Sequence, residues 1–141
     1  MRARLAIVVG IGSALAVVVT GCGRPLYVPS QASPPYPVQL HQAASADIQV
    51  FRDGQSIDVV NSTARSYPAA MVWINQRYVR SVDALPAGQT VRLPLWEFFD
   101  ERGERFNAGG FWRTEEATPV RLVELQISED QPMVGLVLVQ D

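Results

Sequence analysis

Few side chains in this sequence are able to do chemistry. Its 141 residues include one cysteine, Cys22, and one histidine, His41, and all 12 basic residues are arginines. Lysine is therefore absent, which excludes Schiff-base catalysis and a lysine ammonium on phosphate. A serine or threonine nucleophile needs a neighbouring base, and zinc or copper sites need imidazole or thiolate ligands. Residues 47–141 contain neither histidine nor cysteine, so these classes of site are excluded there.

Carboxylates are the remaining candidates, and they cluster between residues 97 and 104 and again at Glu115 and Glu116. The acids of the first cluster are Glu97, Asp100, Glu101 and Glu104. Oxygen ligands on a turn can bind calcium, and two acids about 5–9.5 Å apart can hydrolyse a glycosidic bond. The cluster lacks the acid spacing of calcium loops and contains Arg102 and Arg105, which favours a solvated hairpin with local ion pairs. We therefore predict no catalytic residue, no metal and no cofactor, with a carboxylate-dependent glycan hydrolase as the alternative.

Aromatic side chains are concentrated between residues 96 and 112. Flat rings beside arginine can stack on a glycan or on a partner peptide. The candidate binding surface consists of Trp96, Phe99, Phe111, Trp112 and Arg113. The alternative is core packing, because a small domain needs large side chains between its sheets. Adjacent rings point to opposite sides of a regular strand, so we expect at least one ring of each of the pairs Phe98-Phe99 and Phe111-Trp112 to face outward or to lie in a bulge or loop.

The elements that position these side chains follow a targeting segment. Arg2 and Arg4 precede an uncharged, largely apolar stretch over residues 5–20. This order is typical of the positive and apolar regions of a secretory signal. The stretch is shorter than the roughly 20 residues of a transmembrane helix and contains glycine and serine. We therefore expect residues 1–21 to be a signal peptide.

The apolar stretch ends in Val19-Thr20-Gly21-Cys22, which resembles the lipobox of bacterial lipoproteins. In that family the cysteine sulfur receives a diacylglyceryl group, the signal is cut just before it, and the new N-terminus is usually acylated, for example with palmitate. The resemblance implies lipid attachment at Cys22 and a lipid-anchored place in the bacterial cell envelope. Gly23, rather than Asp, after the cysteine implies the periplasmic face of the outer membrane rather than the inner membrane. The alternative is an ordinary signal peptide with a free or buried cysteine nearby.

Residues 22–46 are predicted to be a linker, because they are rich in proline and contain no acidic residue before the domain. An extended proline-rich chain rises about 3.1 Å per residue, so this disordered tether would hold a domain up to roughly 70 Å from a bilayer. The alternative is a leader that packs along the domain. The apolar residues that favour this alternative are Leu26, Tyr27, Val28 and Tyr36. His41 has no obvious partner base and is expected to be solvated.

The charge of the chain bears on its partners. Removal of residues 1–21 leaves 10 arginines and 14 acidic residues, a net charge of −4. An acidic surface argues against nucleic acid and against electrostatic binding to anionic lipid. We therefore expect membrane attachment through acyl chains on Cys22, with an envelope protein or a cell-wall glycan as the further partner and no nucleic acid.

Residues 47–141 are predicted to form one all-β domain. Asp53-Gly54 and Asn75-Gln76 each mark the turn of a hairpin, and Pro94 places a strand at a sheet edge. The last strand is nearly all apolar and is expected to be central. Residues 95–100 fit either one turn of helix or a strand. The predicted strands cover 48–50, 57–59, 71–74, 77–82, 90–95, 120–127 and 133–139. About seven short strands at this spacing indicate a small antiparallel β-sandwich.

The stretch from Asp58 to Leu125 resembles the immunoglobulin-like and fibronectin-like domains of bacterial exported proteins, through Trp73 and the turn Pro86-Ala87-Gly88-Gln89-Thr90. In that family the tryptophan of the third strand packs centrally. The resemblance implies a fold and no reaction. We therefore expect a membrane-anchored envelope lipoprotein with a non-catalytic binding or structural domain, and the alternative is a carboxylate-dependent hydrolase of envelope glycans.

Overall fold

A computed structural model describes residues 24–111 and 113–139 of the chain. Within these residues the fold is all-β, as predicted, with seven strands and three short 3₁₀ helices. The strands are β1 (Ala44–Asp53), β2 (Ser56–Asn61), β3 (Ala70–Ile74), β4 (Tyr78–Val82), β5 (Thr90–Pro94), β6 (Val123–Gln126) and β7 (Val134–Val139). The 3₁₀ helices are η1 (Pro29–Gln31), η2 (Val38–Leu40) and η3 (Leu95–Glu97).

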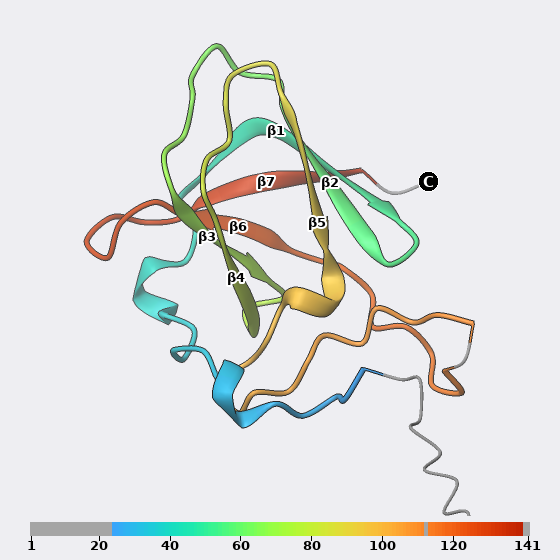
Figure 1. The fold of residues 1–141 in the computed structure, drawn as a ribbon. Helices are drawn as coiled ribbons and strands as arrows, with labels where there is room; N and C mark the ends of the chain where they lie inside the picture. The colour runs from blue at the N-terminus through green and yellow to red at the C-terminus, as the bar shows by residue number, and fades with distance from the viewer. Residues whose placement is uncertain (1–23, 112, 140–141) are drawn as a thin grey trace, which may run out of the picture.

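The strands form one curled sheet in the order β4-β3-β6-β7-β1-β2-β5. The long strand β1 pairs antiparallel with β2 and parallel with β7, and its register against β7 shifts between Ser45 and Gln49. The strands on either side of β1 curl toward each other, which gives two sandwich-like layers around one core (Figure 1). The sheet is therefore mixed rather than wholly antiparallel, because the first and last strands run side by side in the same direction.

Both predicted hairpins are confirmed. The β1–β2 turn contains Gly54 at a φ of 55°, a backbone conformation that glycine adopts readily. In the β3–β4 turn, Asn75 and Gln76 both have positive φ, at 54° and 57°. The Asn75 side chain stabilises this turn, since it donates to the Pro119 carbonyl and accepts from the amide of Arg121. The expected edge strand is also confirmed, because β5 ends at Pro94 at the margin of the sheet.

The core lies between the two layers and follows the alternation of the strands. Ile57 and Val59 of β2 face Val72 and Ile74 of β3, and all four side chains are fully buried. Full burial of a side chain of this size contributes roughly 1.5–3 kcal/mol. The central position predicted for the last apolar strand is confirmed, because β7 lies between β6 and β1. The domain is therefore held together by packing across the two layers.

Residues 24–43, which we call the leader, lie along the domain rather than extending from it (Figure 1). The Val28 amide donates to the Gly103 carbonyl at 2.7 Å, and the Leu40 carbonyl accepts from the Met133 amide at 2.7 Å. The disordered tether predicted for residues 22–46 is therefore corrected over its described part. The proline-rich leader can still bind the domain because proline removes a backbone N–H donor but keeps the carbonyl oxygen, and the domain supplies donors to the carbonyls of the leader.

The leader covers the outer face of β3, β6 and β7. Trp73 is 2% exposed there, and the ring of Tyr36 meets it edge-on with 5.3 Å between centroids. The expectation that Trp73 packs between the layers is wrong, because alternation along β3 turns its neighbours Val72 and Ile74 inward. A Cβ at Gly135 of β7 would overlap the end of the Gln42 side chain, which would then have to move.

Candidate functional site

Two acidic residues of the described chain are buried, and both lie where the leader meets the domain. Asp100 is 2% exposed and follows η3, whereas Glu124 is 0% exposed and sits in the middle of β6. A buried carboxylate is costly unless it is paired and hydrogen-bonded. The partners of these two carboxylates therefore decide what each of them can do chemically.

The Asp100 carboxylate accepts four hydrogen bonds. Arg77 donates to Oδ2 from Nε at 3.0 Å and from Nη2 at 2.8 Å. The backbone amides of Arg102 and Glu104 donate to Oδ1 at 2.9 and 2.8 Å. A carboxylate has about four lone-pair sites, so its acceptor capacity is filled. The turn closes at Gly103, whose φ is 78° and whose missing Cβ leaves room for a leader carbonyl.

These hydrogen bonds fix the charge of Asp100. Burial favours the neutral acid, but the bonds from Arg77 and from the amides of Glu104 and Arg102 outweigh burial and lower the pKa of Asp100 below its ordinary value of 3.8. The carboxylate is therefore ionised near neutral pH, and all of its acceptor sites are filled by hydrogen bonds. A general acid needs a raised pKa and a nucleophile needs a free lone pair, and Asp100 offers neither.

Two other acids of this loop, Glu97 and Glu104, form ion pairs with arginine and have partly exposed side chains. Glu104 lies 2.6 Å from Arg77, and Glu97 pairs with Arg80. Both arginines belong to the β3–β4 hairpin or its turn, whereas the sequence suggested the nearby Arg102 and Arg105 as partners. The expectation of a solvated hairpin with ion pairs is thus correct for the exposed acids and wrong for Asp100. It failed there because Arg77 is distant in sequence.

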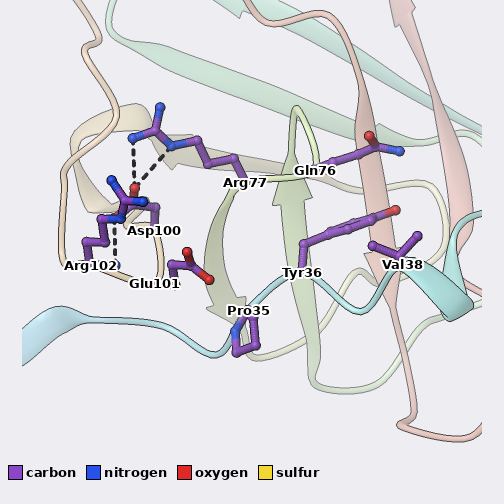
Figure 2. Close-up of a pocket in the computed structure, with 8 residues that line it drawn as sticks. All are labelled: Pro35, Tyr36, Val38, Gln76, Arg77, Asp100, Glu101 and Arg102. Atoms are coloured by element: carbon purple, nitrogen blue, oxygen red, sulfur yellow. Dashed lines mark hydrogen bonds and ion pairs between the residues drawn. The ribbon is translucent and has the colours of Figure 1, made fainter.

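A polar hollow of about 530 Å³ opens between the leader and this loop (Figure 2). Its lining consists of Pro35, Tyr36, Val38, Gln76, Arg77, Asp100, Glu101 and Arg102. Figure 2 shows the Arg77 guanidinium turned toward Asp100, with Tyr36 and Gln76 on the other side of the hollow. Glu101 and Arg102 are exposed at its rim. The hollow can offer polar contacts to a partner, while its buried acid is already engaged.

The Glu124 carboxylate is bound by the leader. The Tyr36 hydroxyl donates to Oε2 at 2.8 Å, and the Gln42 amide donates to Oε1 at 3.0 Å. His41 Nδ1 lies 2.8 Å from Oε1 and 3.0 Å from the Tyr36 hydroxyl. Burial, together with the hydrogen bond to Glu124, raises the pKa of Tyr36, so the phenol remains a protonated donor. His41 is half exposed but not isolated, which corrects the expectation that it is simply solvated.

Sequence reasoning missed the Glu124 cluster. Glu124 alternates with Val123 and Leu125, a pattern typical of a strand with one solvated face, and this pattern gives no sign of a buried carboxylate. The partners Tyr36 and His41 lie in a proline-rich segment that was interpreted as a spacer. The available signal was the aromatic and apolar content of that segment, which favoured packing against the domain.

The residues of the predicted aromatic surface do not all lie together on the outside of the domain. Phe98 is fully buried and Phe99 is 8% exposed, and neither residue belongs to a strand, which agrees with the expectation that one ring of the pair faces outward or lies in a bulge or loop. The segment is not a regular strand, and Arg105 covers the Phe99 ring at 4.7 Å from its centroid. Phe99 therefore offers no exposed ring to a partner.

The remaining members of the predicted surface lie near the start of the leader. Trp96 is half-buried beneath the Arg24 guanidinium, which is 4.4 Å from the ring centroid. Phe111 is 90% exposed and Arg113 is half-buried. Trp112 and Cys22 lie outside the residues that the structure describes.

Comparison with known proteins adds no assignment: no family model matches the chain, and neither a curated protein nor a solved structure matches it significantly. Within residues 24–111 and 113–139, no three side chains of the metal-ligating kinds come together as a site. In the same residues, no helix has the length and apolar character needed to span a membrane.

Proposed function

We propose that this chain is a lipid-anchored protein of the bacterial cell envelope whose small β domain binds a partner or supports a structure rather than catalysing a reaction. The observation that carries the proposal is the position of Cys22. It is the only cysteine, it ends the apolar stretch of residues 5–20 within Val19-Thr20-Gly21-Cys22, and it stands two residues before Arg24, where the described fold begins. The residue after it, Gly23, favours the periplasmic face of the outer membrane.

The state of the acids supports a non-catalytic role. Asp100 has its acceptor sites filled, and Glu124 is held by two leader hydrogen bonds with no exposed surface. A glycosidase needs one carboxylic acid with a raised pKa and a second carboxylate facing the same bond. The pairing of exposed acids with Arg77, Arg80 and Arg92 also weighs against the hydrolase.

The domain suits display of a surface. Its first strand joins two layers by pairing with the second and the last strands, an order compatible with an immunoglobulin-like sandwich. Such domains hold loops rigidly for recognition of a protein or a glycan. The polar hollow beside the leader offers polar side chains to a cell-wall glycan or an envelope protein.

The anchor is tested by metabolic labelling with an alkyne-bearing fatty acid in a bacterium that processes lipoproteins. The wild-type chain should take up the label and sediment with membranes, whereas Cys22→Ser should carry no label. The double variant Cys22→Ser/Ser30→Cys is the matched control, because it restores a thiol outside the lipobox. Label that persists in Cys22→Ser, or that returns in the control, would contradict lipidation at Cys22.

The non-catalytic role is tested by incubating the purified protein with isolated cell-wall glycan. We expect retention of protein on the glycan or on an envelope protein without release of new reducing ends. Release of reducing ends that is abolished by Asp100→Asn or Glu101→Gln would establish the hydrolase instead.

A further inference from the structure

The start of the leader is fastened to the domain, although it was expected to swing free. The Arg105 amide donates to the Leu26 carbonyl at 2.6 Å, and Arg105 Nε donates to the Pro25 carbonyl at 2.9 Å. Arg105 Nη1 also donates to the Trp96 carbonyl, which ties the leader to η3. The two residues that follow Arg24 are therefore tied to the domain by hydrogen bonds.

The lipid anchor would then lie beside the domain. Arg24 lies two positions after Cys22, with Gly23 between them, and two extended positions span at most about 7 Å. If Cys22 carries acyl chains in a bilayer, the surface around Arg24 lies at the headgroups. The spacing of roughly 70 Å that an extended tether would give does not arise, because the leader is bound to the domain.

The surface around Arg24 is positively charged, although the chain as a whole is acidic. After burial, the charges of Arg24 and Arg113 lower the pKa of Arg105, and the nearby charge of Glu97 opposes them without reversing the shift. In the described part of the chain, none of these three arginines forms an ion pair with a carboxylate. Exposed apolar side chains accompany them, namely Leu26, Tyr27 and Phe111.

We propose that this surface, which we call the membrane face (Arg24, Leu26, Tyr27, Arg105, Phe111 and Arg113), lies on the bilayer and binds the headgroups of anionic phospholipids. The proposal rests on the proposed function, because the acylated Cys22 is what brings the face to the membrane. The occupant follows from where the chain leaves the described fold and from charge complementarity. In Figure 1 the blue start of the described chain lies at the end of the molecule opposite the β2–β3 loop.

The expected role of the membrane face is to orient the domain. A basic residue near an anionic surface strengthens binding about fivefold, and amphipathic and apolar side chains settle at the interface. Glu115 and Glu116 continue the same loop and reduce this attraction. The acyl chains supply the affinity, so the arginines decide which side of the domain faces the lipid and which side is presented to a partner.

The test uses the lipidated chain in vesicles and one introduced thiol. Acylated Cys22 has no free thiol, so Thr114→Cys, beside the membrane face, and Ala64→Cys, in the β2–β3 loop, can each be labelled with a thiol-reactive fluorophore. The readout is quenching of the fluorophore by a spin-labelled lipid headgroup. The vesicles are made of phosphatidylcholine, with or without phosphatidylglycerol.

We expect quenching at position 114 to exceed that at position 64 about twofold or more with phosphatidylglycerol at low salt. The difference should shrink in phosphatidylcholine alone and at about 1 M salt, where charges are screened beyond about 3 Å. It should also be lost in Arg24→Gln/Arg113→Gln and kept in Arg65→Gln/Arg92→Gln, which removes the same charge from exposed positions elsewhere. Arg105 is left unchanged because its hydrogen bonds support the fold.

Equal quenching at the two positions would overturn the proposal of a membrane face. So would a difference in quenching that stays the same without phosphatidylglycerol and in Arg24→Gln/Arg113→Gln. The comparisons of salt concentration and vesicle composition use the wild-type arginines, so they test the membrane face even if the double variant folds poorly. Failure of the anchor itself is seen separately. In that case the chain without an introduced thiol takes up the fluorophore at Cys22.

Discussion

Asp100 and Glu124 are both buried carboxylates beside the leader, but their hydrogen-bond donors come from different parts of the chain. The four hydrogen bonds of Asp100 come from Arg77 and from amides in its own loop. Those of Glu124 come from Tyr36 and the Gln42 amide, which are 88 and 82 positions away in sequence. The first carboxylate stabilises a turn within the domain, whereas the second makes the sheet depend on a segment outside it.

The largest loss of folding stability is expected for Asp100→Ala. The substitution removes the acceptor of two loop amides and leaves Arg77 with only the exposed Glu104. Because these donors cannot leave the domain, we expect the free energy of unfolding to fall by about 3 kcal/mol. Urea unfolding monitored by tryptophan fluorescence measures this loss. Asp100→Asn, which keeps an acceptor for the amides, should lose about half as much.

Glu124→Ala should be less destabilising, although Glu124 is the more deeply buried acid. Its donors belong to the leader, which can move into water and hydrate them, so we expect a loss of about 2 kcal/mol. The leader should also become open to proteolysis between Tyr36 and Ala43. The comparison of the two carboxylates would be broken by a leader that stays resistant to protease while stability falls as far as in Asp100→Ala.

Lowering the pH should destabilise the folded protein through protonation of Asp100. The pKa of Asp100 is lowered in the folded chain, so its contribution to stability is fully present above the ordinary value of 3.8 and is lost as the pH falls through the lower folded pKa. The urea midpoint of the wild-type chain should therefore decrease between about pH 5 and about pH 2. Asp100→Asn should show a shallower decrease, and an identical slope in the two proteins would contradict the assignment.

Tyr36→Phe should separate packing of the leader from its hydrogen bond. Phenylalanine keeps the edge-on contact with Trp73 but cannot donate to Glu124. We expect a loss of about 1 kcal/mol, because His41 and the Gln42 amide still face the carboxylate. Protease sensitivity of the leader should rise less than in Glu124→Ala. An unchanged midpoint would show that the phenol contributes only its ring.

The smallest effect is expected at an exposed ion pair. Arg92 lies 2.6 Å from Asp53 and 3.1 Å from Asp58 at the edge of the sheet. Exposed ion pairs are screened by water and salt, so Arg92→Gln should leave the urea midpoint unchanged within error. A clear decrease there would show that the edge strand β5 is held by charge, and it would weaken the contrast drawn between buried and exposed pairs.

Most of the β structure could be predicted from local sequence. Turn residues and alternation place the two hairpins, the edge strand ending at Pro94 and the central last strand. The parallel pairing of β1 with β7 could not be predicted, because it joins strands from the two ends of the chain and leaves no local pattern. The same holds for Trp73, whose burial depends on the leader covering the outer face.

The site was less predictable than the fold. Asp100, Trp96, Phe111 and Arg113 could be singled out by residue type, but the partners that decide their roles could not. Arg77 reaches Asp100 through the β3–β4 turn, and the leader reaches Glu124 across the whole domain. Both contacts join residues distant in sequence, and pattern reasoning on one sequence detects only neighbours.

The central position of β7 has a consequence for the order in which the protein can fold. β7 is the last of the seven strands to be synthesised, yet it separates β6 from β1, so neither of these strands can complete its backbone pairing before β7 has been made. Until Val134–Val139 leaves the ribosome, β1 and β6 keep open edges that invite pairing with other chains. Closure of the sheet therefore has to follow the synthesis of β7.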